Sequence, residues 1–146
     1  MGCIGQRMAR LYQPPAWVDL APVLYARALN RMAVVITRQD RQRGGVYRVK
    51  DAIEAIHGVF HASEGLDPYD GLPLDGRLLA ASEICLPSGR RNDARHLRRQ
   101  PALVACSEAP VCRFALVSRQ TAQAKGEMTI EDYITHCCAV AARATQ

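Results

Sequence analysis

The sequence predicts an α+β fold that is mostly helical and contains a β-hairpin followed by a helix. Three observations support this prediction: a helical apolar pattern over residues 47–62, two short apolar runs over residues 102–106 and 112–118, and a capping signal at Thr129. The chain has 146 residues, which is the size of one domain, and 49% of them are hydrophobic, which argues against a disordered chain.

Two amphipathic helices are expected in the first half of the chain. Residues 21–42 place apolar side chains at intervals of three or four, and the segment opens near Pro22, which a first helical turn tolerates. Residues 47–62 show the clearest pattern. Their apolar face is formed by Val49, Ala52, Ile53, Ile56 and Phe60. Residues 1–20 lack periodicity, so we expect a loosely ordered arm followed by a single domain over residues 21–146.

The second half is expected to contain the hairpin and a closing helix. Cys112, Phe114 and Leu116 occupy alternate positions over 112–118, and the segment 107–110 supplies a turn back to the run 102–106. Residues 77–86 are ambiguous and favour at most a short helical piece. The closing helix begins at Thr129, whose hydroxyl can cap the first turn. Its expected inner face is formed by Tyr133, Ile134, Cys137 and Ala141, which would make Cys137 or Cys138 a small core side chain.

A segment rich in Gly, Pro and Asp, residues 65–76, separates these halves and predicts a series of tight turns. This segment, together with residues 38–44 and 55–57, resembles small bacterial proteins related to the HNH (ββα-metal) endonucleases. The central turn of that family usually reads Asp-x-Tyr-Thr-Gly-Glu-x-Leu-Asp-Trp. The matching residues are Asp67, Tyr69, Gly71 and Asp75. Residues 101–106, 114–118 and 121–137 resemble the family's hairpin and final helix.

The resemblance implies a nuclease scaffold without its catalytic site. An HNH site holds a divalent cation with an Asp-His pair near the end of the first hairpin strand, uses a His as general base and orients it with an Asn. The positions that match the pair lie within residues 104–106, which read Val-Ala-Cys, and the Asn falls on Ala122, whereas Lys125 matches. Methyl groups and a thiol do not replace the oxygen ligands of a hard cation. We therefore expect no catalytic residue, metal or cofactor.

Relocated catalytic groups remain alternatives to this interpretation. Asp93 and His96 lie just before the hairpin and would suit a shifted nuclease site. Cys106 could act as a nucleophile with His96 or His136 as base, although a Cys in a strand is more often structural. Two further sets have ligand chemistry, namely His57 with His61, and Cys106 with Cys112 and His136. The spacing of four between His57 and His61 can hold a metal, but no third His or Cys ligand lies near them in the sequence, and Cys106, Cys112 and His136 do not have the spacing of a standard zinc knuckle.

The net charge of +5 favours an acidic partner. The densest positive segment is 90–99, and its candidate phosphate contacts are Arg90, Arg91, Arg95, Arg98 and Arg99. Nucleic acid is therefore the first expected partner, and an acidic protein is the alternative. A solvated loop in a chain whose codon usage favours Arg would give the same pattern. The chain has no apolar run of about 18 residues and no secretory signal, so we expect a cytoplasmic protein with reduced cysteines and no membrane partner.

Overall fold

The computed structural model describes residues 3–81, 94–107 and 109–146. In chain order the elements are α1 (Cys3–Leu11), the short 3₁₀ helix η1 (Ala16–Val18), α2 (Pro22–Gln42), α3 (Val49–Ala62), α4 (Leu78–Ala81), the 3₁₀ helix η2 (Ala94–Leu97), β1 (Pro101–Ala105), β2 (Phe114–Ser118), α5 (Arg119–Lys125) and α6 (Ile130–Ala144). The fold is thus mixed α+β and mostly helical, with a hairpin followed by a helix, as the sequence predicted. Arg90 and Arg91, along with Asp93, lie outside the described residues.

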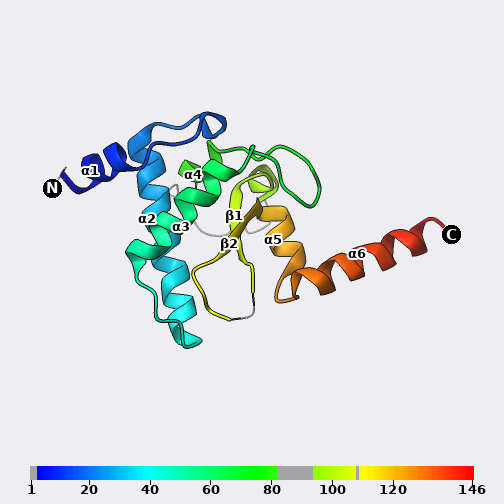
Figure 1. The fold of residues 1–146 in the computed structure, drawn as a ribbon. Coiled ribbons are helices and arrows are strands. Elements are labelled where there is room, and N and C mark those ends of the chain that lie inside the picture. Colours follow the sequence, from blue (N-terminus) through cyan, green and yellow to red (C-terminus); the bar gives the residue numbers. More distant parts are fainter. Residues whose placement is uncertain (1–2, 82–93, 108) are drawn as a thin grey trace.

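The core lies where α2 and α3 pack together and receive the hairpin (Figure 1). Tyr25 and Leu29 of α2, and Ile56 and Phe60 of α3, have no solvent exposure. The Tyr25 and Phe60 rings meet edge to face, with centroids 5.7 Å apart. The apolar face predicted for residues 47–62 therefore packs as expected, because its 3.6-residue period survives in the folded chain.

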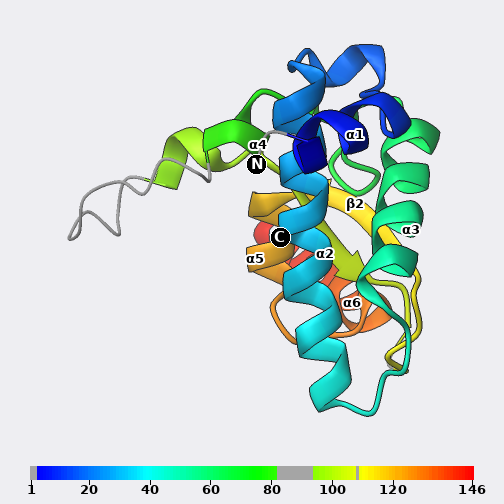
Figure 2. The same cartoon turned by 90° about the vertical axis from the view of Figure 1, so that its left-hand side faces the viewer.

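The hairpin closes the other side of this core. Strands β1 and β2 pair antiparallel, with Leu103 opposite Leu116 at the centre of the register. Phe114 and Leu116 are buried and belong to the same apolar cluster as the helices. Strand β2 packs on α3, and the short helix α5 packs on both strands, so the order strand, strand, helix forms one compact unit. In Figure 2, α2 crosses in front of the hairpin and α5, and α3 lies to the right.

The segment over residues 1–20 differs from the loosely ordered arm that the sequence suggested. Its first part forms α1, which packs on α2. Val18 is fully buried, and the Trp17 ring stacks on Phe60 at a centroid distance of 5.7 Å while its indole Nε1 donates to the Phe60 carbonyl at 3.2 Å. A helix this short gives little periodic signal, and its stability comes from tertiary packing. The arm is therefore part of the folded body.

Helix α6 differs from the sequence prediction in the opposite sense. It begins as expected, with the Thr129 hydroxyl accepting from the Asp132 backbone N–H at 3.1 Å. However, none of its residues is buried, and both Cys137 and Cys138 are exposed. The left-handed φ of +56° at Gly126 turns the chain after α5 and directs α6 away from the body (Figure 1). The predicted inner face is consequently wrong.

The described residues contain no helix long and apolar enough to cross a membrane.

We expect Gly76→Ala to destabilise the protein because the N-terminal segment lies directly against Gly76. A methyl group there would lie 2.4 Å from the Cα of Val18 and 2.5 Å from its carbonyl oxygen. Backbone on both sides cannot yield as a flexible side chain would, so the free energy of unfolding in urea should fall by about 2–3 kcal/mol.

Gly58→Ala is the matched control, because Gly58 lies within α3 and a methyl group there meets nothing within 4 Å. This change should leave stability unchanged or raise it by up to about 1 kcal/mol. Equal effects of the two substitutions would show that the N-terminal segment does not pack against Gly76 in solution.

Candidate functional site

The turn segment, residues 65–76, forms a compact loop. Leu66 and Pro73 form an antiparallel bridge, and the Leu74 N–H donates to the Gly65 carbonyl at 2.7 Å. Gly65 and Gly71 have φ of +81° and +71°, the left-handed region that glycine adopts without strain. The tight turns that the sequence predicted are therefore present, and they bring the two ends of the segment side by side.

The carboxylate of Asp67 holds this loop together and joins it to the hairpin. Asp67 is fully buried. Its Oδ1 accepts from the Tyr69 backbone N–H at 2.7 Å, which shapes the loop itself. Its Oδ2 accepts from the Ser118 backbone N–H at 2.8 Å, which lies at the end of β2. The Thr121 hydroxyl of α5 also hydrogen-bonds to this carboxylate. One side chain thereby connects the turn, the last residue of β2 and the first turn of α5.

These donors also set the charge state of Asp67. Burial alone would raise the pKa of its carboxyl, because the charged form loses its hydration. The opposing hydrogen bonds, from the Ser118 N–H, the Thr121 hydroxyl and the N–H groups inside the turn, favour the anion and bring the pKa below its ordinary value. Asp67 is therefore a permanently charged structural group at neutral pH, and it does not have the raised pKa of a general acid.

Arg99 holds the same loop from outside. Its Nη1 and Nη2 contact the two carboxylate oxygens of Asp70 at 2.8 and 3.3 Å, in the two-pronged geometry that suits a guanidinium. Its Nε donates to the Pro73 carbonyl at 2.8 Å and its Nη2 to the Leu72 carbonyl at 2.7 Å. These contacts occupy the guanidinium, so the structure does not support Arg99 as a phosphate contact. Arg99 therefore stabilises the turn segment.

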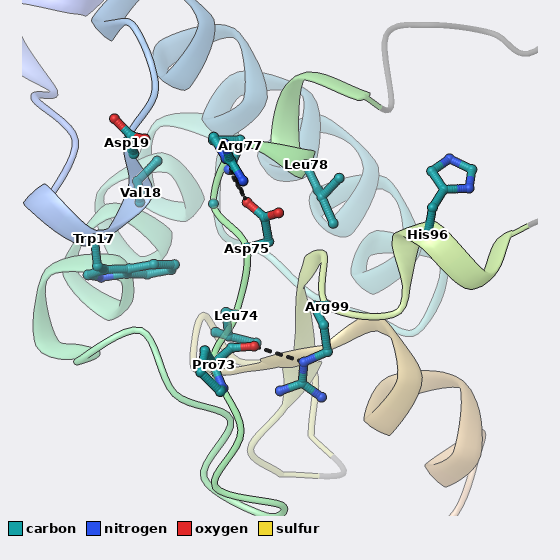
Figure 3. A pocket seen from close by; sticks show the side chains of 11 residues that line it. Trp17, Val18, Asp19, Pro73, Leu74, Asp75, Arg77, Leu78, His96 and Arg99 are labelled. Carbon is teal, nitrogen blue, oxygen red and sulfur yellow. Dashed lines mark hydrogen bonds and ion pairs between the residues drawn. The ribbon is translucent and has the colours of Figure 1, made fainter.

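A cavity of about 450 Å³ opens between the turn segment, the N-terminal segment and η2 (Figure 3). Its polar walls are formed by Asp19, Asp75, Arg77, His96 and Arg99, with Trp17 at one side. Arg77 pairs with Asp75 at 3.3 Å, and the Arg77 side chain is 68% exposed. The walls of the cavity carry both acidic and basic side chains, so its charge does not strongly favour binding of either an anion or a cation.

The positions that the family resemblance assigns to metal binding hold neither a carboxylate nor an imidazole, and among residues 104–106 the side chain with ligand chemistry is the thiol of Cys106. Ala105 is exposed at the end of β1, and Ala122 is half-buried in α5. Within residues 3–81, 94–107 and 109–146, no three side chains of His, Cys, Asp or Glu are grouped closely enough to hold a metal ion. Strands β1 and β2 are followed directly by α5, which packs on both of them.

The other ligand sets have structural partners or lie on open surface. The His57 Nδ1 and the Tyr25 hydroxyl are 2.8 Å apart, and the His61 Nε2 lies 2.7 Å from the Gln13 carbonyl oxygen. Burial and the neighbouring His61 lower the pKa of His57, so this imidazole is neutral near pH 7 and serves the α2–α3 contact. Cys106 and His136 are exposed.

The arginines described in the segment 90–99 have different surroundings. Arg95 and Arg98 are exposed, whereas Arg99 is bound to the turn as described. The roles of Ser118 and Thr121 as partners of Asp67 were not foreseen. The signal that could have revealed them is the Ser-x-x-Thr spacing at the start of α5, where the Ser118 hydroxyl accepts from the Thr121 backbone N–H at 3.0 Å.

Comparisons with known proteins found no relative of this chain. No family model matches the chain, and neither a curated protein nor a solved structure matches it.

We expect Asp67→Asn to lower the free energy of unfolding at pH 7 by about 2–4 kcal/mol, because an amide satisfies the buried donors less well than a carboxylate. The contribution of the anion is present above the unfolded pKa of about 3.9 and is lost as the pH falls through the lower folded pKa. The stability difference between the wild type and the variant should therefore shrink as the pH is lowered from 5 toward 2.

Asp75→Asn is the control for this experiment, because the Asp75 carboxylate accepts from the Arg77 backbone N–H at 3.1 Å, which an amide oxygen can also do, and its ion pair is with the exposed side chain of Arg77. Its effect on stability should be below about 1 kcal/mol. If the Asp67→Asn difference stayed constant down to pH 2, the carboxylate would not be the group that the donors stabilise.

Arg99→Ala and Arg98→Ala should differ although the residues are neighbours. Removing Arg99 deletes the contacts with Asp70, Leu72 and Pro73 and should lower the free energy of unfolding by about 1–2 kcal/mol. Arg98 is exposed, so its replacement should change stability by less than about 0.5 kcal/mol. Urea denaturation of both variants measures this, and equal values would contradict the assignment of Arg99 to the turn.

Proposed function

We propose that this chain is a non-catalytic, HNH-like protein that binds nucleic acid through the phosphate backbone. The residues in contact with phosphate would be Arg95 and Arg98, which lie on η2 and the turn that follows it. The observation that carries the proposal is that these exposed guanidinium groups stand on a segment fixed to the body, residues 94–100.

Two buried side chains anchor this segment. Leu97 and Gln100 are each 8% exposed. The Gln100 side chain donates to the Leu78 carbonyl at 2.8 Å and accepts from the Arg119 guanidinium at 3.1 Å. A solvated, mobile loop would leave such residues free, so the anchors favour a surface that is built to present its charges.

Backbone contacts join the same segment to the start of α5. The Arg98 carbonyl accepts from the Gln120 N–H at 3.1 Å, and the Gln100 carbonyl accepts from the Arg119 N–H at 2.8 Å. The segment thus extends the hairpin by a further pair of residues. Because Arg95 and Arg98 are held in place before binding, fewer side-chain and backbone degrees of freedom are lost when they meet a phosphate.

The surface favours phosphate over bases. No Phe, Tyr or Trp lies within segment 94–100, so the segment lacks the large aromatic rings on which unpaired bases usually stack. Affinity would come from release of counterions and would depend strongly on salt and weakly on sequence. The net charge of +5 agrees with such a partner.

The double variant Arg95→Ala, Arg98→Ala should weaken binding to a 20-base-pair DNA duplex by about tenfold at 0.1 M salt. It should also reduce the slope of log K against log salt by about 2, because two phosphate contacts are lost. Fluorescence anisotropy over a salt series measures both quantities.

Arg38→Ala, Arg41→Ala is the matched control. These exposed residues have the same spacing of three and the same charge, but they lie near the end of α2. The control should change affinity by no more than about twofold. Equal losses for both pairs would mean that binding follows the total charge and would contradict a site at segment 94–100.

A further inference from the structure

The hydrogen bonds on either side of β1 show which of its residues face β2. Just before the strand, the Arg119 N–H donates to the Gln100 carbonyl at 2.8 Å, and just after it the Cys106 N–H donates to the Arg113 carbonyl at 3.2 Å. In an antiparallel ladder, hydrogen-bonded pairs recur at every second residue. The even-numbered residues of β1 therefore point their backbone groups toward β2, and the odd-numbered residues point theirs toward the opposite edge.

Leu103 and Ala105 consequently present their N–H and C=O groups at the outer edge of β1. Among the residues that the structure describes, none hydrogen-bonds to these groups. The outer edge of β2 is different, because the Ser118 N–H donates to the buried carboxylate of Asp67. Strand β1 also has no charged side chain of the kind that often blocks an exposed strand edge. The edge of β1 is therefore open to a further strand.

A groove of about 360 Å³ lies between this edge and α2. Met32, Val35 and Ile36 line it from α2, Leu103 lines it from β1, and the Val35 side chain is 48% exposed. Strand β2 packs on α3. Two strands lie about 4.8 Å apart, whereas packed helices lie about 8–10 Å apart, so a two-stranded sheet is narrower than the helix pair beneath it. A third strand beside β1 would extend the sheet over the apolar face of α2.

We propose that this groove binds an extended peptide segment of a partner protein, which adds to β1 as a third strand. The peptide backbone pairs with the open groups of Leu103 and Ala105, which repeat at about 6.8 Å, twice the rise per strand residue. Alternate peptide side chains then point onto Met32 and Val35, which favours apolar residues at those positions. A helix uses its own backbone groups internally, so the open groups of β1 favour an extended chain as the occupant.

Arg31 indicates one further property of the peptide. Its Nη2 donates to the Leu79 carbonyl at 3.0 Å, which places the guanidinium at the end of the groove beside α4. No Asp or Glu is present among the described residues that line the groove. An acidic residue near one end of the peptide would therefore complement the Arg31 charge. The β1 strand of a second copy fits this end less well, because it has no acidic side chain.

Selection on the full chain from a display library of random octapeptides tests the proposal. We expect enriched peptides to carry apolar residues at every second position and Asp or Glu near one end. Val35→Glu should weaken binding of a synthetic copy of such a peptide at least tenfold, because it places a charge in the groove. Val140→Glu makes the same change at a 55% exposed valine of α6, which does not line the groove, and should change affinity by less than twofold.

Amide hydrogen exchange tests the mode of binding. The bound peptide should slow exchange at Leu103 and Ala105 by about tenfold or more. Exchange at Ala102 and Val104 should change much less, because their N–H groups already pair with β2. Ala105→Pro removes an outward donor without removing a bond to β2, and it should weaken binding by about fivefold.

Backbone methylation of the peptide tests the pairing from the other side. One alternate set of peptide amides faces β1 and the other faces away. N-methylation of the first set should abolish binding, whereas N-methylation of the second set should leave it within about threefold.

Four outcomes would overturn the proposal. They are a library without enriched peptides, equal losses for Val35→Glu and Val140→Glu, equal binding of the two methylated peptides, and self-association at the same edge. Self-association would appear as protection of the Leu103 amide that rises with protein concentration in the absence of peptide, together with a mass approaching twice 16.1 kDa. That last result would assign the edge of β1 to a second copy of this chain.

Discussion

The buried carboxylate of Asp67 is the interaction on which the arrangement of this protein depends. A charge without solvent contact is costly unless donors replace its hydration, and here the donors come from the loop and from the junction of β2 with α5. Because those elements are distant in the sequence, satisfying Asp67 fixes their relative positions. The loop then presents its outer carbonyls to Arg99 and its far end to the N-terminal segment at Gly76. The hairpin with α5, the turn and the segment 94–100 are therefore joined by one network of hydrogen bonds. This network holds the proposed binding surface in place.

The sequence predicted the parts of the fold whose signals are local. The helix at residues 47–62 and the hairpin were recognisable because their apolar periods are also their burial patterns. Helix α6 shows the limit of the same reasoning. Its apolar spacing is real, but periodicity tells that a face is apolar and does not tell which surface covers it. The prediction for the N-terminal segment was wrong for a different reason. Val18 is buried by residues far along the chain, and such burial leaves no periodic pattern in the sequence.

The sequence shows which charged residues the candidate site contains, but it does not show which of them are bound within the fold. The Arg-rich segment is evident from the sequence, yet Arg98 and Arg99 are equivalent there. They differ only because the loop carbonyls and Asp70, 26 to 29 positions earlier, reach one guanidinium and leave the other in solvent. The partners of Asp67 pose the same difficulty, since Ser118 lies 51 positions away. Tertiary contacts decide which donors and charges of this protein are available to a partner, and the sequence alone does not contain those contacts.

The stacking of Trp17 on Phe60 has a practical consequence. Trp17 is the only tryptophan of the chain. Its ring stacks on the Phe60 ring and also lies close to Gly65, since a methyl group added to Gly65 would lie 3.0 Å from the indole. Intrinsic tryptophan fluorescence therefore reports on the contact where the N-terminal segment, α3 and the turn segment pack together. A change in emission that precedes the loss of helical circular dichroism would mark detachment of that segment from a body that is still folded.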